Sequence, residues 1–151
     1  MSEARFSFDP NEWEKIIADL NPSSVIVIGD HNTQTHCWPK LLKHCPSLES
    51  AHKIWLPPGE SEKSIQTAEK VWNQLLEVGA DRKSLVVSLG GGVISDLCGF
   101  VATTYKRGIN FVYVPTTNLA MCDAAIGGKT GINFAGFKNQ IGTIQWPAAI
   151  L

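Results

Sequence analysis

The sequence predicts an α/β fold in which a parallel sheet carries helices on both faces. Short apolar runs, typical of strands buried on both sides, alternate along the chain with segments whose apolar residues recur at the helical period. With 151 residues, 44% of them hydrophobic and 18% charged, the chain has the length and composition of one globular domain. Because strands and helices alternate throughout, we expect parallel strands joined by right-handed crossovers.

The first half of the chain supplies two helices and two strands. Asp9 and Pro10 are expected to start a helix, since proline is tolerated in the first turn. A continuous apolar run over 23–29 ends in a turn signal and suits a buried strand. A helix around 35–44 and a short strand over 52–56 follow.

The second half repeats the alternation. The clearest helix covers 61–78, where the apolar residues form a single stripe at the helical period. The remaining elements are a strand over 84–89, a helix over 93–105, a strand over 110–114 and a further helix capped by Thr116 or Thr117. Together these elements predict a Rossmann-like sheet, in which ligands bind at the carboxyl ends of the strands.

Three consecutive glycines, Gly90, Gly91 and Gly92, stand where a strand gives way to a helix. Glycine carries an entropic cost, so we expect a ligand to approach the backbone there. Free amides at a helix start attract anions, which predicts a phosphate site. The alternative is a tight turn, because Ser95 takes the place of the last glycine of the usual G-x-G-x-x-G pattern. Asp96 follows as a helix cap or as a partner of a ligand hydroxyl.

Other polar residues fall at or near predicted strand ends and could face the same ligand. Lys63 can reach a ligand as a point charge, and Glu60 can accept hydrogen bonds from a ribose. The planar fork of Arg107 suits a phosphate, with an ordinary surface charge as the alternative. The remaining candidates are Asp30, Thr116 and Thr117.

After residue 126 the sequence becomes rich in glycine and polar groups, and we expect a loop over 127–142. Lys129, Lys138 and Asn139 make this segment rich in hydrogen-bond donors, suited to an anionic or hydroxylated ligand. A solvated surface loop is the alternative. The last six residues read as the beginning of another strand, so we expect the chain to be a fragment of a longer protein.

Charge and hydropathy exclude several classes of function. The formal net charge of −1 leaves no basic excess for a nucleic-acid partner. No apolar run reaches the roughly 20 residues that span a bilayer, and the amino terminus has no signal-peptide core, so we expect a cytoplasmic protein with reduced cysteines. A metal site in the HCWPKLLKHC segment is disfavoured, because on a helix its two His-Cys pairs lie about 12 Å apart.

Five motifs, taken in order, resemble the amino-terminal half of the 3-dehydroquinate synthases, which belong to the sugar phosphate cyclases. The motifs are PPGESEK, GGGVISD, TYKRG, PTTNLAMCDAAIGGKTGIN and KNQIG. The resemblance implies an NAD-binding domain over 1–151 and a likeness, more distant, to glycerol dehydrogenases. By motif match, NAD would be held by Asp30, Glu60, Lys63, Gly91, Gly92, Asp96, Thr116, Thr117 and Lys138. Asp123, Lys129 and Asn139 would face the sugar, and Arg107 would hold its phosphate across a dimer interface or within the chain.

The resemblance also implies conversion of 3-deoxy-arabino-heptulosonate 7-phosphate to 3-dehydroquinate and phosphate by a homodimer that uses NAD and zinc or cobalt. The family's metal ligands have no counterpart in this chain, so we expect none here and no turnover by the chain alone. The sequence departs from the family pattern at Ser95, Asn118, Ala124, Ala125 and Phe134. The alternatives are a related cyclase, a polyol dehydrogenase and, if the natural protein ends near Leu151, a stand-alone nucleotide-binding module.

Overall fold

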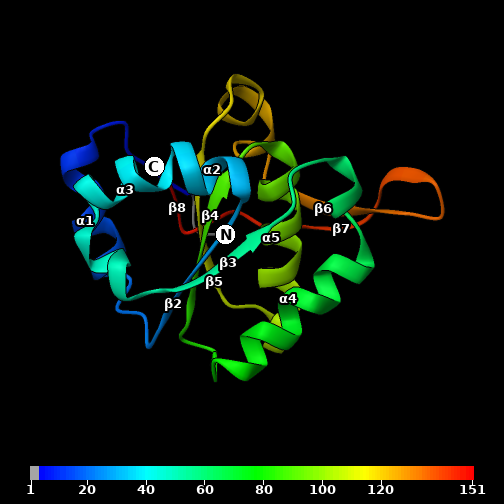
Figure 1. Cartoon of the computed structure of the whole chain (residues 1–151), viewed down its shortest axis with the longest axis horizontal. Helices are drawn as coiled ribbons and strands as arrows, with labels where there is room; N and C mark the ends of the chain where they lie inside the picture. Colours follow the sequence, from blue (N-terminus) through cyan, green and yellow to red (C-terminus); the bar gives the residue numbers. More distant parts are fainter. Residues whose placement is uncertain (1–3) are drawn as a thin grey trace.

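A six-stranded parallel sheet forms the centre of the computed structural model, which describes residues 4–151 (Figure 1). Its order is β1-β8-β5-β4-β2-β3, and every neighbouring pair is parallel. The strands are β1 (Arg5–Phe6), β2 (Val25–Asp30), β3 (His52–Leu56), β4 (Leu85–Gly90), β5 (Asn110–Pro115) and β8 (Ala149–Ile150). The predicted α/β fold is therefore confirmed, and β8 confirms the strand expected at 146–151.

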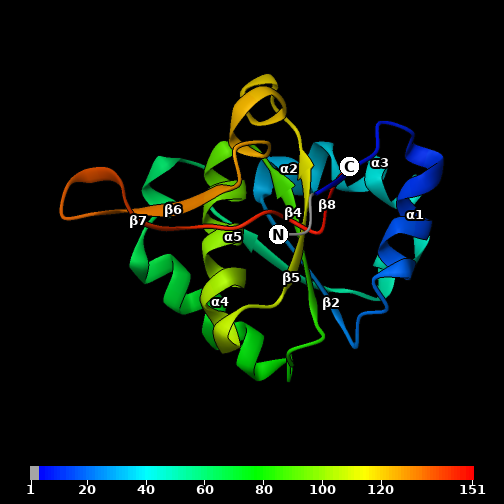
Figure 2. The ribbon, with the colours of Figure 1, turned by 180° about the vertical axis from the view of Figure 1, so that it is seen from behind.

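Helices cover both faces of this sheet, as Figures 1 and 2 show from opposite sides. The helices are α1 (Pro10–Asp19), α2 (His31–His36), α3 (Trp38–His44), α4 (Ile65–Glu77) and α5 (Gly92–Thr104). Short turns of helix are η1 (Pro46–Ser50), η2 (Glu60–Glu62), η3 (Tyr105–Arg107) and the π-helical η4 (Ala120–Ala124). The helix expected after Thr117 is thus present as a short irregular one, and the Thr117 hydroxyl accepts a hydrogen bond from the Ala120 amide at 3.2 Å.

Two separate hydrophobic cores hold the helices to the sheet. Val71 of α4 and Leu97 of α5 are fully buried in the first core, against one face of the strands. Ile16 of α1 and Leu41 of α3 lie in the second core, on the other face. Side chains of β4 alternate between the two, which explains why its sequence is an unbroken apolar run rather than an alternating one.

The helix expected around 35–44 is in fact two helices, α2 and α3, that meet at Cys37. Pro39 explains the break, because a proline inside a continuous helix has no amide to donate and its ring collides with the preceding turn. The first of these helices begins at His31, four residues earlier than expected, because Asp30 caps α2. The Asp30 carboxylate accepts from the Thr33 amide at 2.8 Å, and the Thr33 hydroxyl accepts from the Asp30 amide at 2.9 Å.

The loop expected over 127–142 is wrong, because this segment forms the antiparallel hairpin of β6 (Lys129–Phe134) and β7 (Phe137–Ile144). Ala135 and Gly136 connect the strands with φ of 51° and 83°, as a tight hairpin turn requires. In the sequence, only Gly136 is a residue type that indicates such a turn. The hairpin lies along α5 and projects beyond the sheet (Figure 2).

Two smaller differences concern α4 and β1. The start expected at 61 is replaced by the turn η2, and α4 begins at Ile65 because the Ser64 hydroxyl caps it, accepting from the Thr67 amide at 3.2 Å. The strand β1 was not predicted, because its two residues are too few to show the apolar pattern of a strand. Within residues 4–151, no helix is both long and apolar enough to cross a membrane.

Candidate functional site

A cavity of about 450 Å³ opens at the carboxyl ends of the central strands. Asp30 is the last residue of β2, Gly91 and Gly92 follow β4, and Thr116 and Thr117 follow β5. All five line this cavity. We call it the strand-end cavity. Its position is the one where parallel α/β sheets bind ligands, as the sequence predicts.

The three glycines of the turn differ in what they accommodate. A Cβ on Gly90 would lie 2.5 Å from the Cβ of Ile94, so glycine is required there by packing inside the protein. A Cβ on Gly91 would lie 3.1 Å from the Thr117 Cγ2. On Gly92 it would meet only the Ala124 Cβ, at an ordinary 3.5 Å. The fold leaves room for a methyl group at Gly92, so a glycine there suits a cradle for a group from outside the chain.

The first turn of α5 also lacks a side-chain cap. Gly91 is the N-cap residue and has no side chain to accept from the amides that follow it. Asp96 does not cap the helix either, because its carboxylate is bonded to Lys63. Open amides at the positive end of a 13-residue helix make a suitable seat for an anion.

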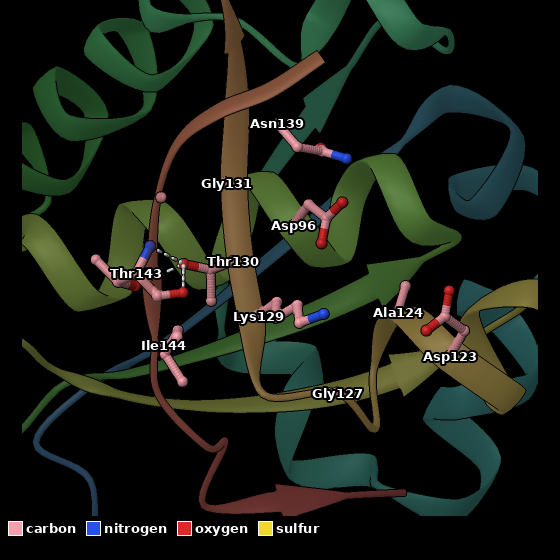
Figure 3. A pocket seen from close by; sticks show the side chains of 11 residues that line it. Asp96, Asp123, Ala124, Gly127, Lys129, Thr130, Gly131, Asn139, Thr143 and Ile144 are labelled. Atoms are coloured by element: carbon pink, nitrogen blue, oxygen red, sulfur yellow. Dashed lines mark hydrogen bonds between the residues drawn. The ribbon is translucent and has the colours of Figure 1, made fainter.

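A second cavity, of about 490 Å³, lies between α5, η4 and the hairpin (Figure 3). Asp96 from α5, Asp123 from η4, Lys129 from β6 and Asn139 from β7 all line it. We call it the hairpin cavity. Ala124, which lines this cavity, lies beside Gly92, which lines the strand-end cavity, so the two cavities are neighbours at the first turn of α5.

Lys63 joins three segments beside the hairpin cavity. Its side chain is only 6% exposed, and its ammonium group contacts both the Asp96 carboxylate and the Asn139 side-chain oxygen. Burial raises the pKa of Asp96, and the adjacent Lys63 opposes this rise. A buried lysine is retained at such a position only with partners of this kind.

Glu60 stands at the rim of this arrangement, on the turn η2. Its Oε1 accepts from the Asn133 side-chain amide at 2.9 Å and lies 3.7 Å from the Lys138 ammonium nitrogen. The hydrogen bond from Asn133 lowers the pKa of Glu60 by more than burial raises it, and the charges of Lys138 and Lys63 add to the lowering. Glu60 is thus favoured as a charged acceptor.

Nine of the predicted site residues line one of the two cavities, and Lys63 contacts two of these nine. Glu60 and Lys138 line neither cavity but lie next to each other, and Glu60 is bonded to Asn133 of the hairpin. Arg107 is apart from all of them. Arg107 lies in η3, beyond the carboxyl end of α5, whereas both cavities lie at its amino end. A helix of 13 residues separates them by about 20 Å. In a single chain, Arg107 therefore cannot act in either cavity.

Two further polar residues were not predicted. Asn133 bonds to Glu60 and to the Asn139 amide, but only the unpredicted hairpin brings these residues together. Thr33 lines the strand-end cavity, and its place three residues after Asp30 is a capping signal that could have been recognised. Among residues 4–151, no group of three or more His, Cys, Asp and Glu could hold a metal ion.

The parallel sheet, the glycine turn into α5 and the cavity across the strand ends define a doubly wound α/β ligand-binding domain. A sequence profile described as 3-dehydroquinate synthase N-terminal matches residues 53–151. The chain therefore belongs to the 3-dehydroquinate synthase family, as its motifs indicate.

Known proteins agree with this assignment. The chain is 45% identical over 136 residues to a 3-dehydroquinate synthase of Pyrococcus abyssi, an alignment covering 90% of this chain and 40% of that protein. A solved 2-deoxy-scyllo-inosose synthase in complex with carbaglucose-6-phosphate, NAD⁺ and Co²⁺ matches with a TM-score of 0.86 and 25% identity, over 97% of this chain and 40% of that one. A 2-epi-5-epi-valiolone synthase from Streptomyces hygroscopicus with NAD⁺ and Zn²⁺ bound matches with a TM-score of 0.82 and 27% identity, over 100% of this chain and 43% of that one. The chain thus spans about two fifths of the length of these proteins.

Proposed function

We propose that this chain is the NAD-binding part of a 3-dehydroquinate synthase. The whole enzyme would convert 3-deoxy-arabino-heptulosonate 7-phosphate into 3-dehydroquinate and phosphate, a step in the synthesis of aromatic amino acids. The proposal rests mainly on one observation: a cavity beside the uncapped start of α5 and a cavity lined with charged and amide groups are neighbours at the first turn of that helix.

The strand-end cavity fits a dinucleotide. The amides after Gly91 would hold its diphosphate, and the vacant Cβ position of Gly92 would let that group approach the backbone. Asp30 uses one carboxylate oxygen for its helix cap and keeps the other for a ligand hydroxyl. The remaining residues assigned to the cofactor are Glu60, Lys63, Asp96, Thr116, Thr117 and Lys138.

The hairpin cavity suits an anionic, hydroxylated sugar acid. Lys129 would pair with a carboxylate or phosphate, while Asp123 and Asn139 would bind ring hydroxyls and orient the ring. NAD, when bound, would accept the hydride of one ring alcohol and return it after phosphate has left. The chain's residues would hold the ring against the cofactor through both transfers, so that the same face is oxidised and reduced.

Arg107 requires a second copy of the chain in this proposal. Because it lies at the far end of α5 from both cavities, it would bind the substrate phosphate only in the site of a partner subunit. We therefore propose a homodimer. We also propose a cytoplasmic location and a divalent metal in the whole enzyme, and we assign no metal ligand within residues 4–151.

Turnover by the intact enzyme that contains this chain tests the proposal. We expect release of phosphate and formation of 3-dehydroquinate from 3-deoxy-arabino-heptulosonate 7-phosphate, with NAD and zinc or cobalt present. The chain alone is expected to bind NAD, measured by calorimetry, without turnover. Cyclisation of a hexose 6-phosphate in place of the heptulosonate would assign the enzyme to a related cyclase instead. Net NADH formation from a polyol would contradict the hypothesis that the enzyme is a sugar phosphate cyclase.

A further inference from the structure

Asn133 occupies an irregular position near the end of β6. The ladder between β6 and β7 shifts register between Ile132 and Phe134, so Asn133 lies at a bulge. Its backbone amide donates to the Lys63 carbonyl at 2.8 Å, and it forms a parallel bridge with Ser64. The hairpin is therefore attached by its backbone to the turn that precedes α4.

The side chain of Asn133 bridges two other groups. Its Nδ2 donates to Glu60 Oε1 at 2.9 Å, and its Oδ1 accepts from the Asn139 amide at 3.0 Å. Because a carboxylate only accepts and a backbone amide only donates, these partners fix the orientation of the Asn133 amide group. Asn139 has a positive φ of 53°, so this bond holds a backbone conformation that is otherwise uncommon.

These contacts close a ring of polar groups beside the hairpin cavity. Asn133 connects Glu60 to the backbone of Asn139, and Lys63 contacts the Asn139 side chain while also bonding Asp96. Asn139 lines the hairpin cavity, whereas Glu60 lies on η2, the turn directly before Lys63. One side-chain amide thus holds both the Glu60 carboxylate and the Asn139 backbone.

We infer that Asn133 is a positioning residue: its side chain holds both the cofactor-binding Glu60 and the sugar-binding Asn139 in the positions they need for their ligands. The inference takes its ligands from the proposed function, but the hydrogen bonds themselves are independent of it. A substitution of the side chain should therefore impair both binding steps, although the bond from the Asn133 backbone still holds the hairpin in place.

Four variants of the intact enzyme test this, one of them Glu60→Gln alone as the reference for the double variant. Asn133→Asp keeps the acceptor for Asn139 but replaces the donor to Glu60 by a second carboxylate. Glu60→Gln with Asn133→Asp reverses the polarity of the bond, since a glutamine can donate to an aspartate. Asn110→Asp makes the same chemical change at an exposed residue at the amino end of β5 and is the control.

We expect Asn133→Asp to raise both the Kd for NAD and the KM for the sugar phosphate about tenfold, the size of one lost hydrogen bond to a charged group. In the Glu60→Gln background, Asn133→Asp should raise the Kd for NAD and the KM for the sugar phosphate less than about threefold. The control should leave both constants as they are. Equal losses in the two backgrounds, or a change in only one constant, would overturn the inference.

Carbon NMR of the Glu60 carboxyl in this chain gives a readout that does not depend on turnover. Asn133→Ala should raise the pKa of Glu60 towards its ordinary value, because the principal cause of its lowering is removed. The Asn139 amide resonance should shift at the same time. An unchanged Glu60 pKa would contradict the positioning role. If wild-type enzyme does not convert the heptulosonate but these NMR changes occur, the proposed function fails and the positioning role stands.

Discussion

Gly92→Ala separates the needs of the fold from those of the ligand. The new Cβ would lie 3.5 Å from the Ala124 Cβ, an ordinary contact, and apart from its chain neighbours and the backbone of α5 it would meet no other heavy atom of the described residues within 4 Å. Because Gly92 is the first residue of α5 and alanine is the better helix former, by at most about 1 kcal/mol, the free energy of unfolding should stay equal or rise slightly. The fold alone therefore gives no reason for a glycine here.

NAD binding should respond differently to the same substitution. A methyl group at Gly92 would hold the diphosphate away from the helix amides and remove at least one hydrogen bond to a charged group. Such a bond contributes about 1.5–3 kcal/mol, so the Kd should rise about 10- to 150-fold. Calorimetry of NAD binding and thermal unfolding, made on the same preparation, measure the two effects.

Gly90→Ala is the matched contrast. Its Cβ would lie 2.5 Å from the Ile94 Cβ, so this variant should lose stability because α5 must move away from β4. Unchanged NAD affinity in Gly92→Ala would refute the reasoning, and so would a loss of stability as large as that of Gly90→Ala.

Three further predictions concern polar side chains. Asp96→Ala should weaken NAD binding by roughly 1–3 kcal/mol in calorimetry and destabilise the fold, because it leaves the Lys63 ammonium without its carboxylate; unchanged affinity would show that Asp96 serves the fold alone. The pKa of Asp96 is raised in the native state, so the contribution of Asp96 to stability should fall as the pH increases from the ordinary pKa of 3.8 through the raised one. The pKa of Glu60 is lowered, so the contribution of Glu60 should be present above pH 4.5 and lost on acidification. Denaturant unfolding of the wild type, Asp96→Asn and Glu60→Gln across this pH range tests both directions. Tyr113→Phe should stabilise the chain by about 1 kcal/mol, because the Tyr113 hydroxyl is buried with no hydrogen-bond partner within residues 4–151, and a decrease in the denaturation midpoint would contradict this.

Much of the fold could be predicted because its signals are local. The apolar runs that become β2, β4 and β5 are buried on both faces, and the stripe along α4 has a strong helical period. Helix boundaries were less accurate, because they depend on single residues such as the Asp30 cap and Pro39. The hairpin was missed because its residues are mostly exposed, which removes the alternation that identifies a strand.

The site followed the same division. Residues at strand ends, such as Asp30 and Thr117, could be grouped because parallel strands end at one edge of the sheet. The contacts of Lys63 with Asp96 and Asn139 span 33 and 76 residues, and no local pattern predicts such pairs. Asn133 was missed for the same reason, since its importance depends on the register of the hairpin.

The central claim is that the amides at the start of α5 bind the diphosphate of NAD. A crystal structure of the intact enzyme with NAD tests it most directly. The account predicts diphosphate oxygens within about 3.2 Å of backbone nitrogens in the segment from Gly91 to Val93. A diphosphate bound elsewhere, for example in the cavity beside Glu14 and His52 at the opposite end of the sheet, would contradict it.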